Sequence, residues 1–414
     1  MAGFVYVIGT ADTKCKELLW LKSCLQAAEV DAYIIDVSTL IPTPYCDDSQ
    51  IDFSSSQVAA YHPDGPDSVF LSERNQSVSA MSVALSHFLH NTSEDIAGLI
   101  GIGGSCGTAL IAAALKPIPI GVPKLMVSTM ASGNVASYVG GMDIAMLNTV
   151  TDLTGLNYLS RTILANAANM MAGAVTFKGQ HNPAQKTVLG LTMFGVTTPC
   201  VNQLIARLED EYDPLVFHAT GNGGMSMEKL INDGEIIGAL DITLTEIADY
   251  LFGGELACDG TRLDCISHTG IPWVGSSGGL DMINFTDRQS VPEHYRDRPF
   301  VKHNDQVMLV RTSPEENYQL GVWIGEKLNR CTGQIYFIIP EGGFSALDAP
   351  GKPFFHPEAT QAFVYGLMTT VRQTAQRQII KTPYHINAPE FAALAYKAFN
   401  TIMQHQGQTF ESLS

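Results

Sequence analysis

Apolar runs that end at small residues, each followed by a helical segment, recur along this chain and constrain its fold. Residues 4–10 read FVYVIGT and residues 32–37 read AYIIDV, and the segment between them places leucines at helical spacing. A strand, a helix and a second strand in this order form a parallel βαβ unit. The alternation continues through later runs such as residues 306–312, QVMLVRT. We therefore predict an α/β protein with doubly wound parallel sheets in both halves.

The size and composition of the chain predict two domains. Its 414 residues, of which 45% are hydrophobic and 16% charged, exceed what one hydrophobic core usually serves. Residues 178–186, KGQHNPAQK, have the composition of a linker. We expect one Rossmann-like domain over residues 1–180 and a second over residues 186–414. Such an apolar chain with few charges is also expected to bury surface between two copies, so we predict a homodimer.

The two halves resemble each other in the order of three landmarks. FVYVIGTADTK in the first half corresponds to VLGLTMFGVTT in the second. In the same way IAGLIGIGG corresponds to IIGALDITL, and GVPKLMVSTMASGN to GIPWVGSSGGLDMIN. An old duplication would produce this order. The alternative is that any two doubly wound domains look this similar, and the sequence leaves both explanations open.

Charge and hydropathy exclude several classes of partner. With 41 acidic against 24 basic residues the net charge is −17, which repels a nucleic acid backbone. Residues 96–115 are uncharged and long enough for a bilayer span, but their five glycines favour a buried strand and a glycine loop. The amino terminus lacks a signal-type segment, and no cysteines have CxxC spacing. We expect a cytoplasmic protein without membrane contact, and reduced thiols, among them Cys15, Cys106 and Cys200.

Loops at the ends of the expected strands of the first half are candidates for binding an anion. The first, residues 9–14, offers Thr10, Thr13 and Lys14, with Thr10 or Asp12 as cap of the next helix. An ordinary capped helix is the alternative. The second loop, residues 101–108, reads GIGGSCGT, which is neither a Walker A motif nor the dinucleotide fingerprint but suits a phosphate or carboxylate. Its candidate ligands, with those of a third loop after residue 127, are Gly103, Gly104, Ser105, Gly107, Thr108, Ser128 and Thr129.

The second half offers a further glycine loop beside acidic residues. His218 precedes the run TGNGG, and an imidazole there could donate to phosphate or transfer a proton. Asp241 and Glu246 could act as acid and base, although helix capping explains Asp241 equally well. No HExxH motif occurs among the 11 histidines, so we expect no dedicated metal site. The candidates for binding a substrate are Thr220, Gly221, Gly223, Gly224 and Asp281.

Long collinear motifs carry a family resemblance. GTADTK, IGIGGSCGTA, PKLMVSTMASG, LTMFGVTTPCV and FSALDAPGKPF resemble, in this order, the Tm-1-like ATP-binding family, and the likeness extends over nearly the whole chain. The resemblance implies two Rossmann-like domains in a dimer, with ATP binding as the best supported activity. The second glycine loop departs from the family's GTGGRAME, since Asn222 replaces Thr and Met225 replaces Arg. This departure favours the first domain, or the cleft between the domains, for the nucleotide.

Three functions are consistent with these observations. The leading prediction is an ATP-binding protein, with Mg²⁺ accompanying the ATP, that acts on a small anionic metabolite through His218, Asp241 and Glu246. The alternative is a non-catalytic protein whose binding to a partner responds to nucleotide. A third is an enzyme whose glycine loops hold a substrate carboxylate.

Overall fold

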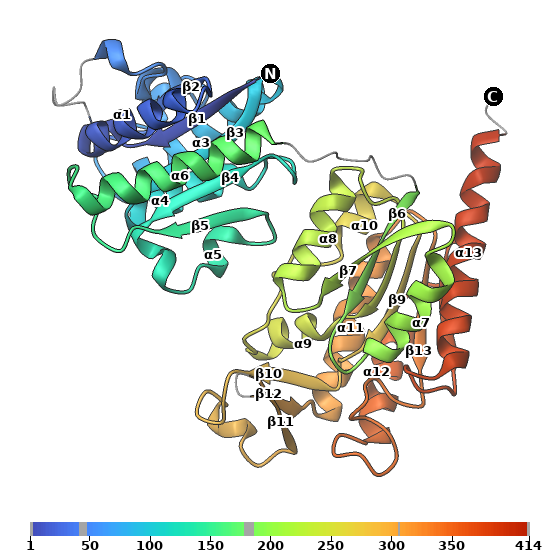
Figure 1. The fold of residues 1–414 in the computed structure, drawn as a ribbon. Coiled ribbons are helices and arrows are strands. Elements are labelled where there is room, and N and C mark those ends of the chain that lie inside the picture. Colours follow the sequence, from blue (N-terminus) through green and yellow to red (C-terminus); the bar gives the residue numbers. More distant parts are fainter. Residues whose placement is uncertain (1–2, 41–47, 178–185, 305–306, 412–414) are drawn as a thin grey trace. The chain divides into compact units, whose positions relative to one another are not determined.

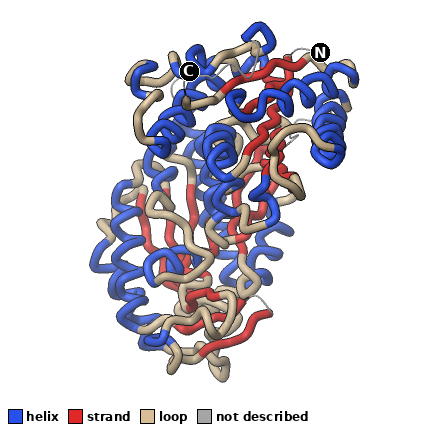
Figure 2. Tube along the Cα trace, turned by 90° about the vertical axis from the view of Figure 1, so that its left-hand side faces the viewer, coloured by secondary structure: helices blue, strands red, loops and turns tan. Residues whose placement is uncertain are grey.

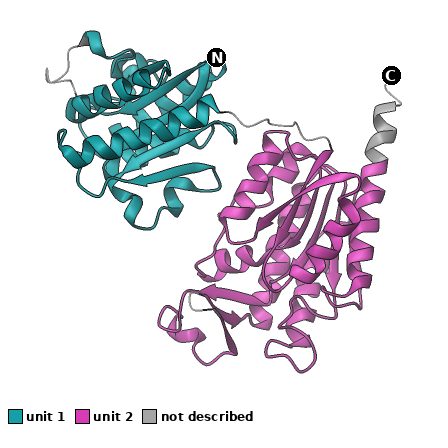
Figure 3. Ribbon diagram, viewed as in Figure 1, with its two compact units in different colours: residues 1–181 teal, residues 182–414 magenta. Residues whose placement is uncertain are grey.

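The computed structural model describes residues 3–40, 48–177, 186–304 and 307–411. The chain forms two compact units, residues 1–181 and residues 182–414 (Figure 3). No helix in the described ranges has both the length and the apolar character needed to cross a membrane.

The first unit is built on a parallel sheet of five strands in the order β2-β1-β3-β4-β5 (Figure 1). In the register, Val5 of β1 pairs with Ala32 on one side and with Gly98 on the other. The strands are β1 (Phe4–Gly9), β2 (Ala32–Asp36), β3 (Ile96–Gly103), β4 (Lys124–Ser128) and β5 (Ile144–Asn148).

Helices cover both faces of this sheet, as the blue helices beside the red strands in Figure 2 show. Val5 and Val7 of β1 pack with α1 and α6, whereas Tyr6 and Ile8 pack on the opposite face with α3 and α4. Burial on both faces explains why the strands read as continuous apolar runs. The helices are α1 (Ala11–Ala27), α2 (Ser55–Ala59), α3 (Arg74–Asn91), α4 (Ser105–Leu115), α5 (Ala136–Val139) and α6 (Tyr158–Thr176).

The second unit contains a parallel sheet of six strands in the order β14-β13-β9-β8-β6-β7. Helices α7 and α13 pack on one face, and α8 to α12 cover the other. The strands are β6 (Thr187–Met193), β7 (Tyr212–His218), β8 (Ala239–Thr243), β9 (Trp273–Gly278), β13 (Ile335–Pro340) and β14 (Arg377–Thr382). The helices are α7 (Thr198–Leu208), α8 (Asn222–Asn232), α9 (Thr245–Phe252), α10 (Asp264–Thr269), α11 (Pro314–Arg330), α12 (Pro357–Thr370) and α13 (Pro389–Glu411).

A small antiparallel sheet lies between β9 and α11 along the chain. It has the order β10-β12-β11, with β10 (Met282–Phe285), β11 (Phe300–Asn304) and β12 (Val307–Arg311). The sequence interpretation that placed residues 306–312 among the parallel strands is therefore wrong for β12. No α-helix separates β10, β11 and β12 among the described residues, and the connection from β11 to β12 is far shorter than the crossover that a parallel pair needs.

The two parallel sheets confirm the predicted α/β fold class with two Rossmann-like units. Read from its other edge, the second sheet runs β7-β6-β8-β9-β13, which repeats the connectivity β2-β1-β3-β4-β5 of the first. The landmarks paired in the sequence fall on equivalent strands, β3 with β8 and β4 with β9. An old duplication would produce this order, as would the general similarity of doubly wound domains. In each sheet the chain turns back at one point, between β1 and β3 and between β6 and β8, where open sheets usually bind ligands.

Candidate functional site

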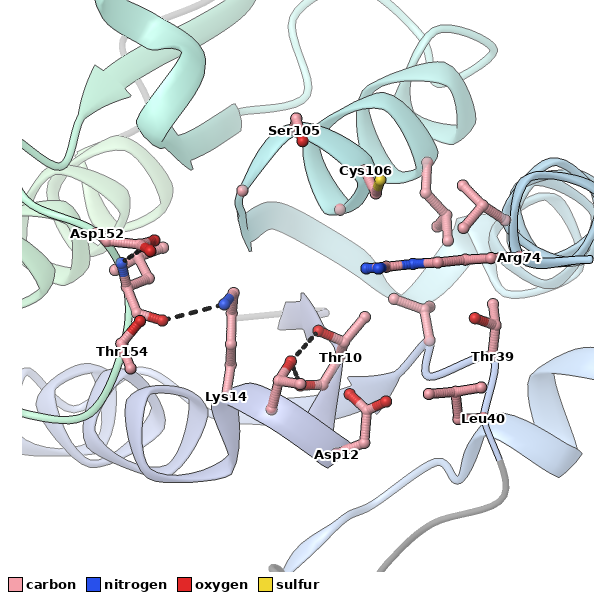
Figure 4. A pocket seen from close by; sticks show the side chains of 17 residues that line it. Thr10, Asp12, Lys14, Thr39, Leu40, Arg74, Ser105, Cys106, Asp152 and Thr154 are labelled. Carbon is pink, nitrogen blue, oxygen red and sulfur yellow. Dashed lines mark hydrogen bonds between the residues drawn. The ribbon is translucent and has the colours of Figure 1, made fainter.

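A pocket of about 560 Å³ opens at the turning point of the first sheet. It lies beyond the carboxyl end of β1 and contacts the first turns of α1 and α4 (Figure 4). Its wall brings together five residues predicted from separate loops of the sequence: Thr10, Thr13, Gly104, Ser105 and Gly107. Lys14, also predicted, extends into the same pocket.

The amino terminus of α4 is open toward the pocket. Gly104 is the N-cap and forms no side-chain cap. Within the described ranges, no hydrogen bond is made by the backbone N–H groups of Ser105, Cys106 or Gly107, and all three residues line the pocket. A Cβ built on Gly104 would find only Thr129 Oγ1, at 3.9 Å, so open space surrounds this turn. Free N–H groups at the positive end of a helix dipole make this turn suitable for an anion.

The amino terminus of α1 is closed, contrary to the expectation for the first loop. Asp36 Oδ1 accepts a hydrogen bond from Ala11 N at 2.9 Å, and Ser38 Oγ accepts one from Asp12 N at 3.1 Å. The next two N–H groups donate to the carbonyl of Thr10. The protein's own side chains therefore occupy the place that a phosphate would take at α1, and this helix contributes side chains rather than N–H groups.

Two cationic side chains extend into the pocket from different sides (Figure 4). Lys14 Nζ donates to the carbonyl of Leu153 at 3.0 Å, and its backbone kinks α1 at φ −131°. Arg74 comes from the first residue of α3. In the part of the chain that the structure describes, no carboxylate lies within ion-pair distance of Arg74. Sequence reasoning missed Arg74, because its position depends on how α3 packs against α4.

The remaining predicted ligands of the first unit lie outside the pocket wall. Thr108 is fully buried, and its Oγ1 lies 2.6 Å from Ser128 Oγ and 3.3 Å from the carbonyl of Gly103. A Cβ on Gly103 would lie 2.8 Å from the backbone of Gly107. These contacts hold the loop in shape, and neither Gly103, Thr108, Ser128 nor Thr129 is part of the pocket wall.

Cysteine chemistry differs from the expectation at one position beside the pocket. Cys106, in the pocket wall, and Cys200, in the core, are free thiols as expected. Cys15 is disulfide-bonded, so the prediction of a reduced thiol is wrong for this residue. CxxC spacing could not have indicated this bond, because a disulfide depends on which residues the fold brings together.

In the second unit, the predicted acidic residues belong to a buried ionic network. Arg262, which the sequence analysis did not identify, donates from Nη2 to Asp241 Oδ1 at 2.8 Å and from Nε to Glu246 Oε1 at 2.5 Å. Its Nη1 donates to Glu228 Oε1 at 2.8 Å. Asp241, Glu246 and Arg262 are at most 2% exposed. Burial raises the pKa of Glu246, and the positive charge of Arg262 partly offsets this rise because it favours the ionised carboxylate. This network is enclosed within the unit.

The glycines of the second loop fit closely against this network. Gly221 has φ +77°, and its N–H donates to Glu246 Oε2 at 2.7 Å. A Cβ on Gly224 would lie 2.0 Å from Glu246 Oε1, and one on Gly223 would lie 1.8 Å from the carbonyl of His218. The backbone N–H of Thr220 donates to that same carbonyl at 2.8 Å, and its hydroxyl donates only a long hydrogen bond of 3.4 Å. Glycine is therefore needed at these positions so that the loop can pack against the Glu246 carboxylate and the His218 carbonyl.

His218 lies at the exposed end of β7. Its ring packs against Phe194 with the centroids 5.2 Å apart, and His303 stacks on the same Phe194 at 6.0 Å. Burial, and then His303, lower the pKa of His218. The structure thus places this imidazole in an aromatic stack that favours its neutral form.

The turning point of the second sheet is filled by the protein itself. Thr197, in the loop after β6, and Thr243, at the end of β8, are fully buried, and their hydroxyl oxygens lie 2.7 Å apart. Thr192 Oγ1 donates to Asp241 Oδ1 at 2.7 Å beside them. This is the topological equivalent of the first-unit pocket.

Asp281 lies in a second buried polar cluster. Ser345 Oγ donates to its Oδ2 at 2.6 Å, and among the described residues its Oδ1 has no hydrogen-bond partner. Burial, and then the neighbouring Asp348, raise the pKa of Asp281 from 3.8 to about 7. Asp249, also buried, has its pKa raised to about 7 mainly by burial.

These shifts predict how stability depends on pH. Between about pH 4 and pH 7 the folded state keeps these protons and the unfolded state releases them, so their stabilisation is complete at low pH and lost as the pH rises through 7. We expect the free energy of unfolding to be larger near pH 5 than near pH 8. Asp281→Asn should reduce this difference, leaving the part due to Asp249 and the other buried carboxylates whose pKa values are raised. Urea denaturation at both pH values measures it, and an unchanged difference in Asp281→Asn would contradict the assignment.

Fold and pocket together define a class: a two-unit Rossmann-like α/β protein with an anion-type pocket at the turning point of its first sheet. Comparison with known proteins gives the family. Residues 3–180 match the N-terminal domain of the uncharacterised protein family UPF0261, and residues 186–403 match its C-terminal domain. The chain belongs to the UPF0261 family.

Its relatives include bacterial and plant proteins. A UPF0261 protein of Rhizobium meliloti is 47% identical over 96% of this chain and 98% of its own length. One of Mesorhizobium japonicum is 45% identical over 97% of this chain and 99% of its own. The ToMV resistance protein Tm-1 of Solanum lycopersicum is 42% identical over 95% of this chain and 55% of its own length. The likeness to Tm-1 seen in the motifs is thus confirmed at the level of the family.

Proposed function

We propose that this protein binds ATP in the pocket of the first unit. The observation that carries the proposal is the convergence, at the turning point of the sheet, of the open α4 terminus with Lys14 and Arg74. Backbone N–H groups and two cations from separate helices suit the oxygens of a polyphosphate. The ionic network and the filled turning point of the second unit support the choice of the first unit.

The shape and lining of the pocket also suit a nucleotide. Beside the polar loops, part of its wall is apolar, formed by Val37, Leu40, Val78 and Leu110. Leu40 is 62% exposed, so this wall offers apolar surface that a flat ring could cover. Pockets that bind small molecules typically combine such apolar walls with a few placed polar groups. Phosphates would lie on α4, and the base against the apolar wall.

Titration calorimetry with ATP and Mg²⁺ tests the proposal. We expect Lys14→Ala to weaken binding by about 1–3 kcal/mol, as for the loss of a charge-assisted hydrogen bond. The variant should also show a weaker dependence of affinity on salt, since one charge contact is gone. Lys397→Ala, at an exposed position of α13, serves as the control and should bind as the wild type does. Equal affinity of Lys14→Ala and wild type at all salt concentrations would contradict the site.

Turnover separates the two functions that share this site. Release of ADP that a metabolite stimulates would support an enzyme, whereas tight binding without release would support a nucleotide-responsive binding protein. The predicted homodimer and the anionic substrate remain proposals alongside this one.

A further inference from the structure

Asp12 lies in the first turn of α1, where a negative charge favours the helix dipole, but its carboxylate does not cap the helix. A helix start would use such a side chain as a cap, but α1 has Thr10 at the N-cap without a side-chain cap, and Asp36 and Ser38 accept from its first N–H groups. Asp12 Oδ1 is buried, and among the described residues it has no hydrogen-bond partner. A buried carboxylate oxygen without a partner costs free energy unless something binds it.

This carboxylate lies within the proposed nucleotide site. Asp12 lines the same pocket as Lys14 and Arg74, and Figure 4 shows it beside Thr10. The formal charges of the lining side chains, Asp12 and Asp152 against Lys14 and Arg74, sum to zero. A polyphosphate bound to Lys14 and Arg74 would add negative charge that these two cations do not balance. The Asp12 carboxylate and the phosphates would then repel each other unless a cation lay between them.

We propose that Asp12 binds the divalent cation that accompanies the nucleotide. The inference rests on the proposed function and assigns the metal side of the same site. Mg²⁺ prefers oxygen ligands and is usually held by one or two carboxylates together with substrate phosphates and water. No group of three metal-binding side chains gathers in the described ranges, which fits a cation that is held jointly by the protein and the phosphates. Asp12 supplies the protein's carboxylate oxygen, and the phosphates on α4 supply the others.

The test compares ATP affinity with Mg²⁺ and with EDTA in wild type, Asp12→Asn and Asp67→Asn. Asp67 is the matched control, because it is an exposed aspartate of the first unit that does not line the pocket. We expect wild type and Asp67→Asn to bind ATP at least about tenfold more tightly with Mg²⁺ than with EDTA. Asp12→Asn should bind more weakly than wild type in Mg²⁺, and as tightly or more tightly in EDTA, because a repulsive charge is removed.

Opposite changes under the two conditions cannot arise from a loss of folding, which would lower both affinities. Asp12→Asn with both affinities lowered equally, or with the Mg²⁺ effect of the wild type, would overturn the inference. Equal affinity of the wild type for ATP with and without Mg²⁺ would also overturn the inference about the cation, but it would leave the proposed nucleotide site unaffected. If neither ATP nor inorganic tripolyphosphate binds the wild type under either condition, the proposed function itself fails.

Discussion

Arg262→Met is expected to destabilise the second unit by about 3–5 kcal/mol, the cost of leaving buried charges without their partner. Arg262 donates to three carboxylates at once, those of Glu228, Asp241 and Glu246. Methionine fills much of the same volume but offers no N–H group, so three acidic groups would face one another in a dry interior. Urea denaturation of the whole chain, with the free energy of unfolding extrapolated to water, measures the loss.

Two further measurements distinguish this explanation from a packing defect. Arg330→Met changes an arginine side chain that is 61% exposed and 3.7 Å from Asp264, and it should cost less than about 1 kcal/mol. Burial raises the pKa values of Glu228 and Glu246, so protonation at lower pH should reduce the repulsion left in Arg262→Met. The deficit relative to wild type should therefore shrink near pH 5. A deficit that is small, or that is the same at pH 5 and pH 8, would contradict the electrostatic role.

Gly104→Val is expected to weaken the free energy of nucleotide binding by about 3 kcal/mol or more, while the protein stays folded. Gly104 has φ −80° and ψ −162°, which any residue can adopt, and its Cβ would have no neighbour closer than 3.9 Å. The branched side chain would stand where the phosphates approach the open N–H groups of α4, and each such charge-assisted hydrogen bond contributes about 1.5–3 kcal/mol. ATP titration together with the thermal unfolding midpoint measures both effects.

The matched control is Gly173→Val on α6, another glycine with open space around its Cβ but outside the pocket. It should bind ATP as the wild type does. Because valine removes no charge, Gly104→Val should leave the salt dependence of any remaining binding unchanged, unlike Lys14→Ala. Wild-type affinity in Gly104→Val would move the nucleotide away from α4.

The sequence predicted the fold and part of the candidate site, and the rest could not be predicted for physical reasons. Strand-loop-helix order is local, so the sheets and the loops holding Lys14 and Gly104 could be anticipated. Arg74 and Arg262 could not, because the pocket that Arg74 lines and the carboxylates that Arg262 binds come from distant segments of the chain. The loop containing Gly221 and Gly224 has the composition of an anion-binding loop, because glycine lets another group come close to the backbone. The sequence does not show whether that group is a ligand or, as here, the chain's own Glu246.

The hydroxyl contact of Thr197 with Thr243 has a consequence for how the two halves can vary. Both halves repeat one connectivity, but the same topological position is a crevice in the first unit and buried interior in the second. We therefore expect substitutions in the wall of the crevice to change what the first unit binds while the unit stays folded. Substitutions at Thr197 or Thr243 are instead expected to reduce the stability of the second unit, because they leave a buried hydroxyl without its partner.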